Sequence, residues 1–142
     1  MRLANRRIFL IEDNLSNKAI AQLLLEREGA RVQIDRWGVD AVARLRALLP
    51  VDVILLDLMF PGFVTGYDIF QRIRELPELR AIPVVAVSAA DASIAIPTTM
   101  EMGFSGFIGK PLDFVRFPMQ IQQIIDGGSI WYRPGDPFAS KM

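Results

Sequence analysis

The stretch Val51-Asp-Val-Ile-Leu-Leu-Asp57-Leu-Met-Phe-Pro-Gly62 decides the fold class of this chain. Its apolar run, Val53 to Leu56, has the length and the β-branched content of a strand that is buried on both faces of a parallel sheet. The run ends on a carboxylate, Asp57, and a Pro-Gly turn signal follows. A buried strand that delivers an aspartate at its C-terminal end indicates a site at the edge of the sheet.

Short apolar runs alternate with amphipathic segments of helical length along the chain, which is typical of a parallel sheet built from βα repeats. We expect five strands: Ile8–Ile11, Arg31–Asp35, Val53–Leu56, Val84–Ser88 and Gly106–Ile108. We expect five helices: Asn14 (the N-cap) to about Glu28, Val39–Leu49, Tyr67–Arg74, Asp91–Met102 and Leu112–Asp126. The residues from Gly127 onward are expected to form a non-helical tail.

Several finer expectations accompany these elements. The second strand is more polar than the others, so it belongs at an edge of the sheet. Pro97 should shorten, delay or kink the fourth helix, and Pro118 should weaken the last one, because proline lacks the amide hydrogen that the helix needs. The first helix should end at Gly29 and bury one apolar stripe: Ile20, Leu23, Leu24 and Leu25.

The composition limits the possible functions. The chain has 142 residues, of which 51% are hydrophobic, so it can bury the core of one compact domain. It contains no cysteine and no histidine, which excludes thiolate and imidazole metal sites, cysteine nucleophiles and a phosphohistidine donor role. The net charge is zero without a basic cluster, which argues against nucleic acid as a direct ligand. Glu12-Asp13 interrupts the first apolar run, so we expect a cytoplasmic protein without a membrane span.

The chemistry-bearing side chains follow the strands. Right-handed crossovers place the C-terminal ends of parallel strands along one edge, where α/β proteins put their sites. Glu12 and Asp13 follow the first strand and Asp57 ends the third, so three carboxylates meet there and repel one another unless a cation neutralises them. Because the chain has no histidine or cysteine, the cation that best suits such an all-oxygen site is Mg²⁺. Ser88 and Lys110, after the fourth and fifth strands, suit a phosphoryl group that joins later.

These residues resemble the response regulator receiver family of two-component signalling over roughly residues 7 to 126. Four motifs carry the resemblance: Ile-Glu12-Asp13-Asn, Leu-Leu-Asp57-Leu-Met-Phe-Pro61-Gly62, Val-Ser88-Ala89 and Gly-Phe107-Ile-Gly-Lys110-Pro111. The resemblance implies a flavodoxin-like, doubly wound α/β fold with a five-stranded parallel sheet of order 2-1-3-4-5. It implies a single receiver domain over residues 1–126, with a tail over 127–142 in which no output domain is recognisable.

The resemblance also implies the reaction. Asp57 is the nucleophile that accepts a phosphoryl group from a histidine kinase or a histidine phosphotransfer protein. Asp13 binds Mg²⁺ directly, Glu12 binds it directly or through water, and the main-chain carbonyl of Met59 is a further ligand. The chain is then a signalling phosphoacceptor that catalyses only its own phosphorylation and dephosphorylation, and not a conventional enzyme.

Three further residues follow from the resemblance. Ser88 donates its hydroxyl to a phosphoryl oxygen and Lys110 pairs with another. Phe107 is the switch aromatic, whose rotamer is linked to the Ser88 hydroxyl. Phosphorylation thereby switches a surface that binds an output partner. The sequence does not identify this partner, and it leaves open whether the chain forms a homodimer.

The sequence departs from the family pattern in two places, and a third feature bears on the lifetime of the phosphoprotein. The loop Phe63-Val64-Thr65-Gly66 is longer by one residue and more apolar than usual, and it lacks the acidic residue before the glycine. Pro97 lies in the fourth helix, which many receivers use for output. The positions that flank the path of an attacking water are Met59 and Ala90, which cannot orient or deprotonate it. We therefore expect slow self-dephosphorylation.

Other functional classes fit less well. A phosphatase of the haloacid-dehalogenase kind needs a second aspartate two residues after the first, where this chain has Met59. A dinucleotide-binding enzyme needs a glycine fingerprint after the first strand, where this chain has Glu12-Asp13-Asn14. The alternative that remains is a receiver-like binding module that works through protein contacts without phosphorylation.

Overall fold

A computed structural model describes residues 1–36, 40–60 and 64–135 of the chain. In these residues a single parallel sheet has the order β2-β1-β3-β4-β5-β6. Its strands are β1 (Arg7–Ile11), β2 (Arg31–Asp35), β3 (Val53–Leu56), β4 (Val84–Ser88), β5 (Gly106–Gly109) and β6 (Ile130–Tyr132). The expected order is confirmed for the first five strands, and β2 lies at an edge as predicted.

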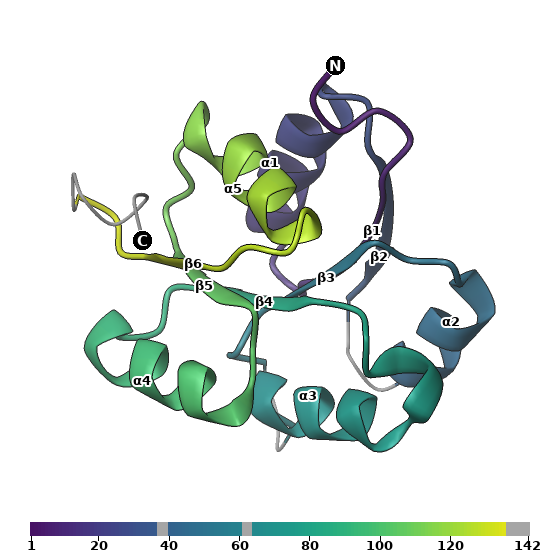
Figure 1. Ribbon diagram of the computed structural model, residues 1–142. Helices are drawn as coiled ribbons and strands as arrows, with labels where there is room; N and C mark the ends of the chain where they lie inside the picture. The colour runs from purple at the N-terminus through teal and green to yellow at the C-terminus, as the bar shows by residue number, and fades with distance from the viewer. Residues whose placement is uncertain (37–39, 61–63, 136–142) are drawn as a thin grey trace.

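Helices cover both faces of the sheet (Figure 1). One face carries α1 (Leu15–Glu26) and α5 (Arg116–Ile125). The other face carries α2 (Ala41–Leu48), α3 (Gly66–Glu75) and α4 (Ala92–Met102), with a short 3₁₀ turn at Pro77–Leu79. The expected start of the second helix, Val39, lies outside the described residues. Among the described residues, no helix is long and apolar enough to cross a membrane.

The sheet divides the core into two apolar clusters, because alternate side chains of a strand point to opposite faces. In β3, Val53 and Leu55 belong to the cluster that also contains residues of α1 and α5. Ile54 and Leu56 belong to the cluster with residues of α2, α3 and α4. All four side chains are fully buried, as expected for a strand that lies inside the sheet between β1 and β4.

The prediction of five strands is wrong, because the tail contributes a sixth. Ile130–Tyr132 pairs in parallel with β5, with Phe107 opposite Trp131 and Ile108 opposite Tyr132. Three residues are too few to give a clear periodic pattern, and the preceding Gly127-Gly128 reads as the start of a loop. As a result β5 is an inner strand, and β6 is the edge.

The first helix buries a different stripe from the predicted one. Leu24 and Leu25 are buried as expected, but Ile20 is 37% exposed and Leu23 is 63% exposed. The third buried residue of α1 is Ala21. The core therefore lies on the face of positions 21, 24 and 25, and the larger side chains of Ile20 and Leu23 lie outside it. The N-cap prediction is confirmed, since the Asn14 side chain accepts a hydrogen bond from the Asn17 amide.

Proline affects the last two helices less than expected. Pro97 neither shortens nor delays α4, which runs from Ala92 to Met102 behind the N-cap Asp91. The last helix begins at Arg116, four residues later than predicted, because the Asp113 side chain accepts from the backbone amides of residues 115 and 116. Pro118 is the third residue of α5, where an amide has no partner within the helix, so its missing hydrogen costs little.

Candidate functional site

Three carboxylates gather at the C-terminal ends of the central strands. The pairing of Ile11 with Leu56 in neighbouring strands places the next residues, Glu12 and Asp57, side by side. Carboxylate oxygens of Glu12, Asp13 and Asp57 all lie within 4.8 Å of one another. Glu12 is 3% exposed and Asp57 is 7% exposed, so two of the charges are shielded from water. The sheet thus concentrates negative charge at one point of its edge.

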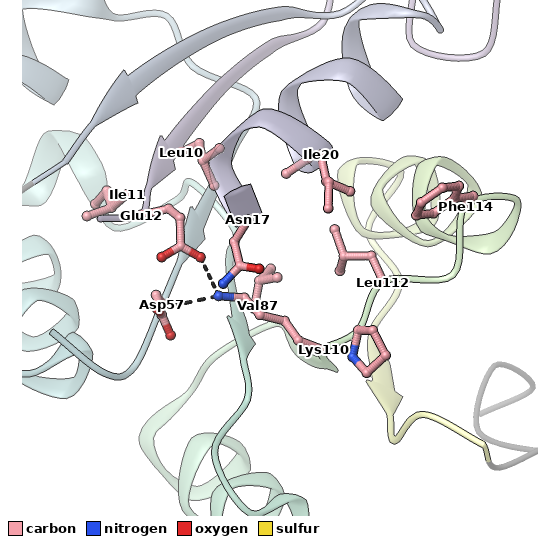
Figure 2. Close-up of a pocket in the computed structure, with 12 residues that line it drawn as sticks. Leu10, Ile11, Glu12, Asn17, Ile20, Asp57, Val87, Lys110, Leu112 and Phe114 are labelled. Carbon is pink, nitrogen blue, oxygen red and sulfur yellow. Dashed lines mark hydrogen bonds and ion pairs between the residues drawn. The ribbon is translucent and has the colours of Figure 1, made fainter. Parts of the chain in front are cut away.

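Lys110 supplies the opposite charge (Figure 2). Its ammonium group forms ion pairs with a carboxylate oxygen of Glu12 and with Oδ2 of Asp57, the latter at 3.5 Å. The backbone amide of Lys110 donates to the Ser88 carbonyl at 2.9 Å, which fixes the start of this residue beside β4. Because a single ammonium faces three carboxylates, the cluster keeps a net negative charge.

Burial changes the acidity of Glu12. Removal from water raises the pKa of Glu12 to about 7, and the charge of Asp57 acts in the same direction. The hydrogen bond from Lys110 and its positive charge act against this rise. A cation bound nearby would favour the ionised form of Glu12, which burial and the neighbouring negative charge disfavour.

The backbone around Asp57 is held from both sides. The Asp57 amide donates to the Ile11 carbonyl at 3.1 Å, and its Oδ1 accepts from the Met59 amide at 3.3 Å. The first residue of α3, Gly66, packs so closely that a Cβ there would lie 2.1 Å from the Asp57 carbonyl oxygen. Only glycine permits this contact, which fixes the end of β3 against the start of α3.

A capping box holds the start of α3 in place. The Thr65 side chain accepts from the Asp68 amide, and the Asp68 side chain accepts from the Thr65 amide at 2.9 Å. The pattern Thr-x-x-Asp before an apolar helical face could have indicated this cap, but our sequence analysis did not use it. Thr65 therefore has a structural role as the N-cap of α3.

Ser88 and Phe107 lie on the strands beside the carboxylates. Ser88 ends β4 and is fully buried, and its hydroxyl oxygen accepts from the Ala90 amide at 3.2 Å. Phe107 is also fully buried, in the cluster on the side of α2, α3 and α4, and pairs in register with Ala86 of β4. Both residues are thus next to the site in the sheet without lining the carboxylate cluster itself.

The residues above the site are only partly described. Met59 is 59% exposed, so its side chain points away from the core. Val64 is half-buried and packs against the cluster on the side of α3. Pro61 and Gly62, which carry the turn signal, and Phe63, which begins the longer apolar loop, lie outside the described residues.

The structure adds an apolar cavity that the sequence analysis missed. It has a volume of about 230 Å³ and lies between α1 and the segment before α5, beside the ion pairs of Lys110 (Figure 2). Glu12, Asp57 and Lys110 line its polar end, and its walls are mostly apolar: Leu10, Ile20, Val87, Pro111, Leu112 and Phe114. The exposed Ile20 could have indicated it, had we not placed this residue in the core.

The donor set fits a hard divalent cation. Three carboxylates whose oxygens lie within 4.8 Å of one another are ligands of the kind that Mg²⁺ prefers. The residues that could hold it are Glu12, Asp13 and Asp57. Chemically, the same arrangement offers one nucleophilic carboxylate, Asp57, with a lysine ammonium at 3.5 Å to stabilise added negative charge.

Comparisons with known proteins agree with this geometry. A family model described as the response regulator receiver domain matches residues 8–122. The chain is 31% identical over 110 residues to the polar-differentiation response regulator DivK of Brucella ovis, covering 78% of this chain and 88% of DivK. It is 30% identical over 121 residues to the transcriptional regulatory protein AfsQ1 of Streptomyces coelicolor, covering 85% of this chain but only 52% of AfsQ1. The chain therefore spans about half the length of that relative.

A solved structure of a receiver domain is similar to this chain over most of its length. The receiver domain of sensor histidine kinase PA1611 from Pseudomonas aeruginosa has a TM-score of 0.76 and 26% sequence identity to this chain. The match covers 88% of this chain and 100% of that domain. That domain carries a magnesium ion coordinated in its active site cleft.

Proposed function

Because the chain belongs to the response regulator receiver domain family, we propose that it accepts a phosphoryl group on Asp57 from a phosphohistidine donor in a Mg²⁺-dependent reaction. The observation that carries the proposal is the convergence of the Glu12, Asp13 and Asp57 carboxylates within 4.8 Å, with the Lys110 ammonium beside them. This cluster is costly for stability, since it buries like charges, and such a cost is typical of a functional site.

The proposed transfer exchanges one bond for another. A carboxylate oxygen of Asp57 attacks the phosphorus, the new P–O bond forms, and the P–N bond to the donor imidazole breaks. The imidazole leaves with the bonding electron pair and takes up a proton. When bound, Mg²⁺ would neutralise the phosphoryl oxygens; Glu12, Asp13, Asp57 and the main-chain carbonyl of Met59 would hold it.

Lys110 and Ser88 would bind the phosphoryl group after transfer. In the unmodified protein, the Lys110 ammonium pairs with Glu12 and Asp57. An added phosphoryl group offers it a stronger anion, and the Ser88 hydroxyl, which now only accepts a hydrogen bond from Ala90, still has its own hydrogen to donate. Movement of Ser88 toward the phosphoryl group would change the packing of Phe107 on the neighbouring strand and so alter the surface.

The surface around the site supports a protein as the donor. Phe114 is 59% exposed and Ile20 is 37% exposed, and both place apolar side chains in the lining of the cavity beside the carboxylates. Exposed apolar side chains next to a reactive group are typical of a protein-binding surface. A histidine kinase or histidine phosphotransfer protein is the donor class that fits; the output partner stays unidentified.

The domain limits and location also remain proposals. We propose a receiver domain over residues 1–126 whose tail, 127–142, adds strand β6 to the sheet. We propose a cytoplasmic location, since phosphohistidine donors of this signalling class act there. The chain would act as a signalling phosphoacceptor and would not process a separate substrate.

The test is incubation with acetyl phosphate and Mg²⁺, followed by intact mass. We expect the protein to gain one phosphoryl group, and Asp57→Asn to gain none, because an amide cannot attack phosphorus. Asp40→Asn is the matched control, since Asp40 is exposed and caps α2 without a side-chain hydrogen bond. Equal labelling of the Asp57 and Asp40 variants would contradict the assignment. Absence of label on the unaltered protein would favour the alternative, a binding module that works without phosphorylation.

A further inference from the structure

The C-terminal edge segment, residues 130–134, lies directly on the strand that leads to Lys110. Its first three residues form β6 and pair with Gly106, Phe107 and Ile108 of β5. The segment continues past the end of β6 to Pro134, which reaches Gly109. Gly109 immediately precedes Lys110 and pairs in register with Ser88. One short strand, β5, therefore carries the phosphate-binding lysine at its end and this segment along its outer edge.

Two glycines allow the segment to approach this closely. A Cβ on Gly106 would lie 2.5 Å from the Ile130 carbonyl oxygen, and a Cβ on Gly109 would lie 2.5 Å from Cδ of Pro134. Real side chains do not tolerate such distances, so the edge segment fits only because both ends of β5 lack side chains. There is therefore no room for a side chain between either end of β5 and the segment.

The segment also covers the switch aromatic. Phe107 and Trp131 are register partners on neighbouring parallel strands, so their side chains leave the sheet on the same face. Phe107 is fully buried, and Trp131 is half-buried and packs against the cluster that contains Phe107. A fully buried ring in a close-packed core can change its position only when a neighbour moves. Trp131 is such a neighbour, because it lies on the edge strand and is only half-buried.

The segment is held weakly compared with the rest of the sheet. β6 has three residues and one neighbouring strand, and its buried anchors are Ile130 and Tyr132. Residues 133–135 after it are exposed. A short edge strand with two apolar anchors is the kind of element that opens locally while the domain stays folded.

We infer that the C-terminal edge segment is coupled to the state of Asp57: it is docked on β5 in the unmodified protein and loosened when Asp57 is phosphorylated. The inference rests on the proposed function. Phosphorylation changes the partners of Lys110, which is covalently bonded to Gly109, and of Ser88, which accepts a hydrogen bond from the Lys110 amide and is the register partner of Gly109. Because Pro134 lies so close to Gly109 that a side chain there would not fit, a shift at the end of β5 displaces the segment. Loosening exposes the outer edge of β5 and one flank of Phe107.

The coupling has to work in both directions. If phosphorylation loosens the segment, a change that loosens the segment favours phosphorylation by the same factor. Gly109→Ala is suited to this test, because the nearest atoms that its methyl group meets all belong to the segment: Cδ and Cγ of Pro134 and the Tyr132 carbonyl oxygen. A second substitution, Pro134→Ala, removes the two ring atoms that the methyl group meets and should restore docking in the double variant.

The experiment is hydrogen exchange of the full chain, read by mass spectrometry on peptides that contain residues 130–132. Protein treated with acetyl phosphate and Mg²⁺ should exchange these amides at least tenfold faster than untreated protein, while treated Asp57→Asn should not change. Gly109→Ala should exchange faster without any donor and should be phosphorylated to a greater extent at the same acetyl phosphate concentration, and both effects should reverse in Gly109→Ala/Pro134→Ala.

The possible failures are distinguishable because intact mass is measured on the same samples. Phosphoprotein whose residues 130–132 exchange at the unmodified rate overturns the inference and leaves the proposed function standing. Exchange that stays slow in Gly109→Ala also overturns the inference, since the contact with Pro134 then does not hold the segment. A chain that gains no phosphoryl mass overturns the proposed function and the inference with it.

Discussion

The strands β3 and β6 belong to the same sheet but differ in almost every physical respect. β3 lies between β1 and β4, and all four of its side chains are fully buried. β6 has one neighbouring strand, and its middle residue, Trp131, is half-buried. The comparison teaches that Asp57, the proposed phosphoacceptor, directly follows a strand whose side chains are all buried, whereas the edge strand β6 is only partly buried.

The two strands should respond differently to the loss of a buried side chain. Leu55 of β3 and Ile130 of β6 belong to the same core cluster and are 0% and 1% exposed. Leu55→Ala should lower the free energy of unfolding by about 3 kcal/mol, because the surrounding strands prevent collapse of the cavity. Ile130→Ala should lower it by roughly 1 kcal/mol, because the loss cannot exceed the free energy with which β6 docks. Urea denaturation of both variants measures the difference, and equal losses would show that β6 is as firmly integrated as β3.

Divalent metal should stabilise the centre of the molecule. Mg²⁺ at about ten times its dissociation constant should add ~1.4 kcal/mol of stability by mass action, which for a chain of this size raises the melting temperature by about 5 °C. The physical reason is relief of the repulsion among Glu12, Asp13 and Asp57. The measurement is thermal unfolding at increasing metal concentration. Asp13→Asn should lose most of the shift and Asp40→Asn should keep it; an unchanged curve at millimolar metal would indicate a degenerate site.

The lifetime of the phosphoprotein should depend on Met59. Its exposed thioether cannot orient or deprotonate an attacking water, and neither can the methyl group of Ala90. We expect slow decay after donor removal with Mg²⁺ present, and about tenfold faster decay in Met59→Asn or Met59→Glu, which corresponds to a barrier lowered by ~1.4 kcal/mol. Met119→Asn, at a methionine that is 45% exposed on α5, is the matched control. Loss of the phosphoryl group from the unaltered protein within seconds would contradict the expectation of slow decay.

The elements that could be predicted from the sequence are those whose signal is long or repeated. Val53 to Leu56 is an uninterrupted apolar run, so its burial on both faces of the sheet could be predicted from the sequence. The grouping of Glu12, Asp13 and Asp57 followed from the rule that parallel strands end at one edge. Neither inference needed knowledge of side-chain packing.

The missed features depend on packing that no local pattern records. Ile20 and Leu23 are as apolar as the residues that the core buries, and only the position of α1 against the sheet decides that Ala21 is buried instead. β6 is three residues long and forms because Gly106 and Gly109 leave room for it, which is a contact between distant parts of the chain. The late start of α5 depends on the Asp113 side chain, which accepts a hydrogen bond from the Arg116 amide. The apolar pattern alone predicts a start at Leu112.

The central claim is that Asp57 itself carries the phosphoryl group, and chemical trapping tests it most directly. Borohydride reduces an aspartyl phosphate to homoserine, so the modified residue can be found by sequencing peptides of protein treated with acetyl phosphate and Mg²⁺. We predict homoserine at position 57 and aspartate at positions 13 and 52. Homoserine at another position, or none in a protein that has gained the mass of a phosphoryl group, would contradict the assignment.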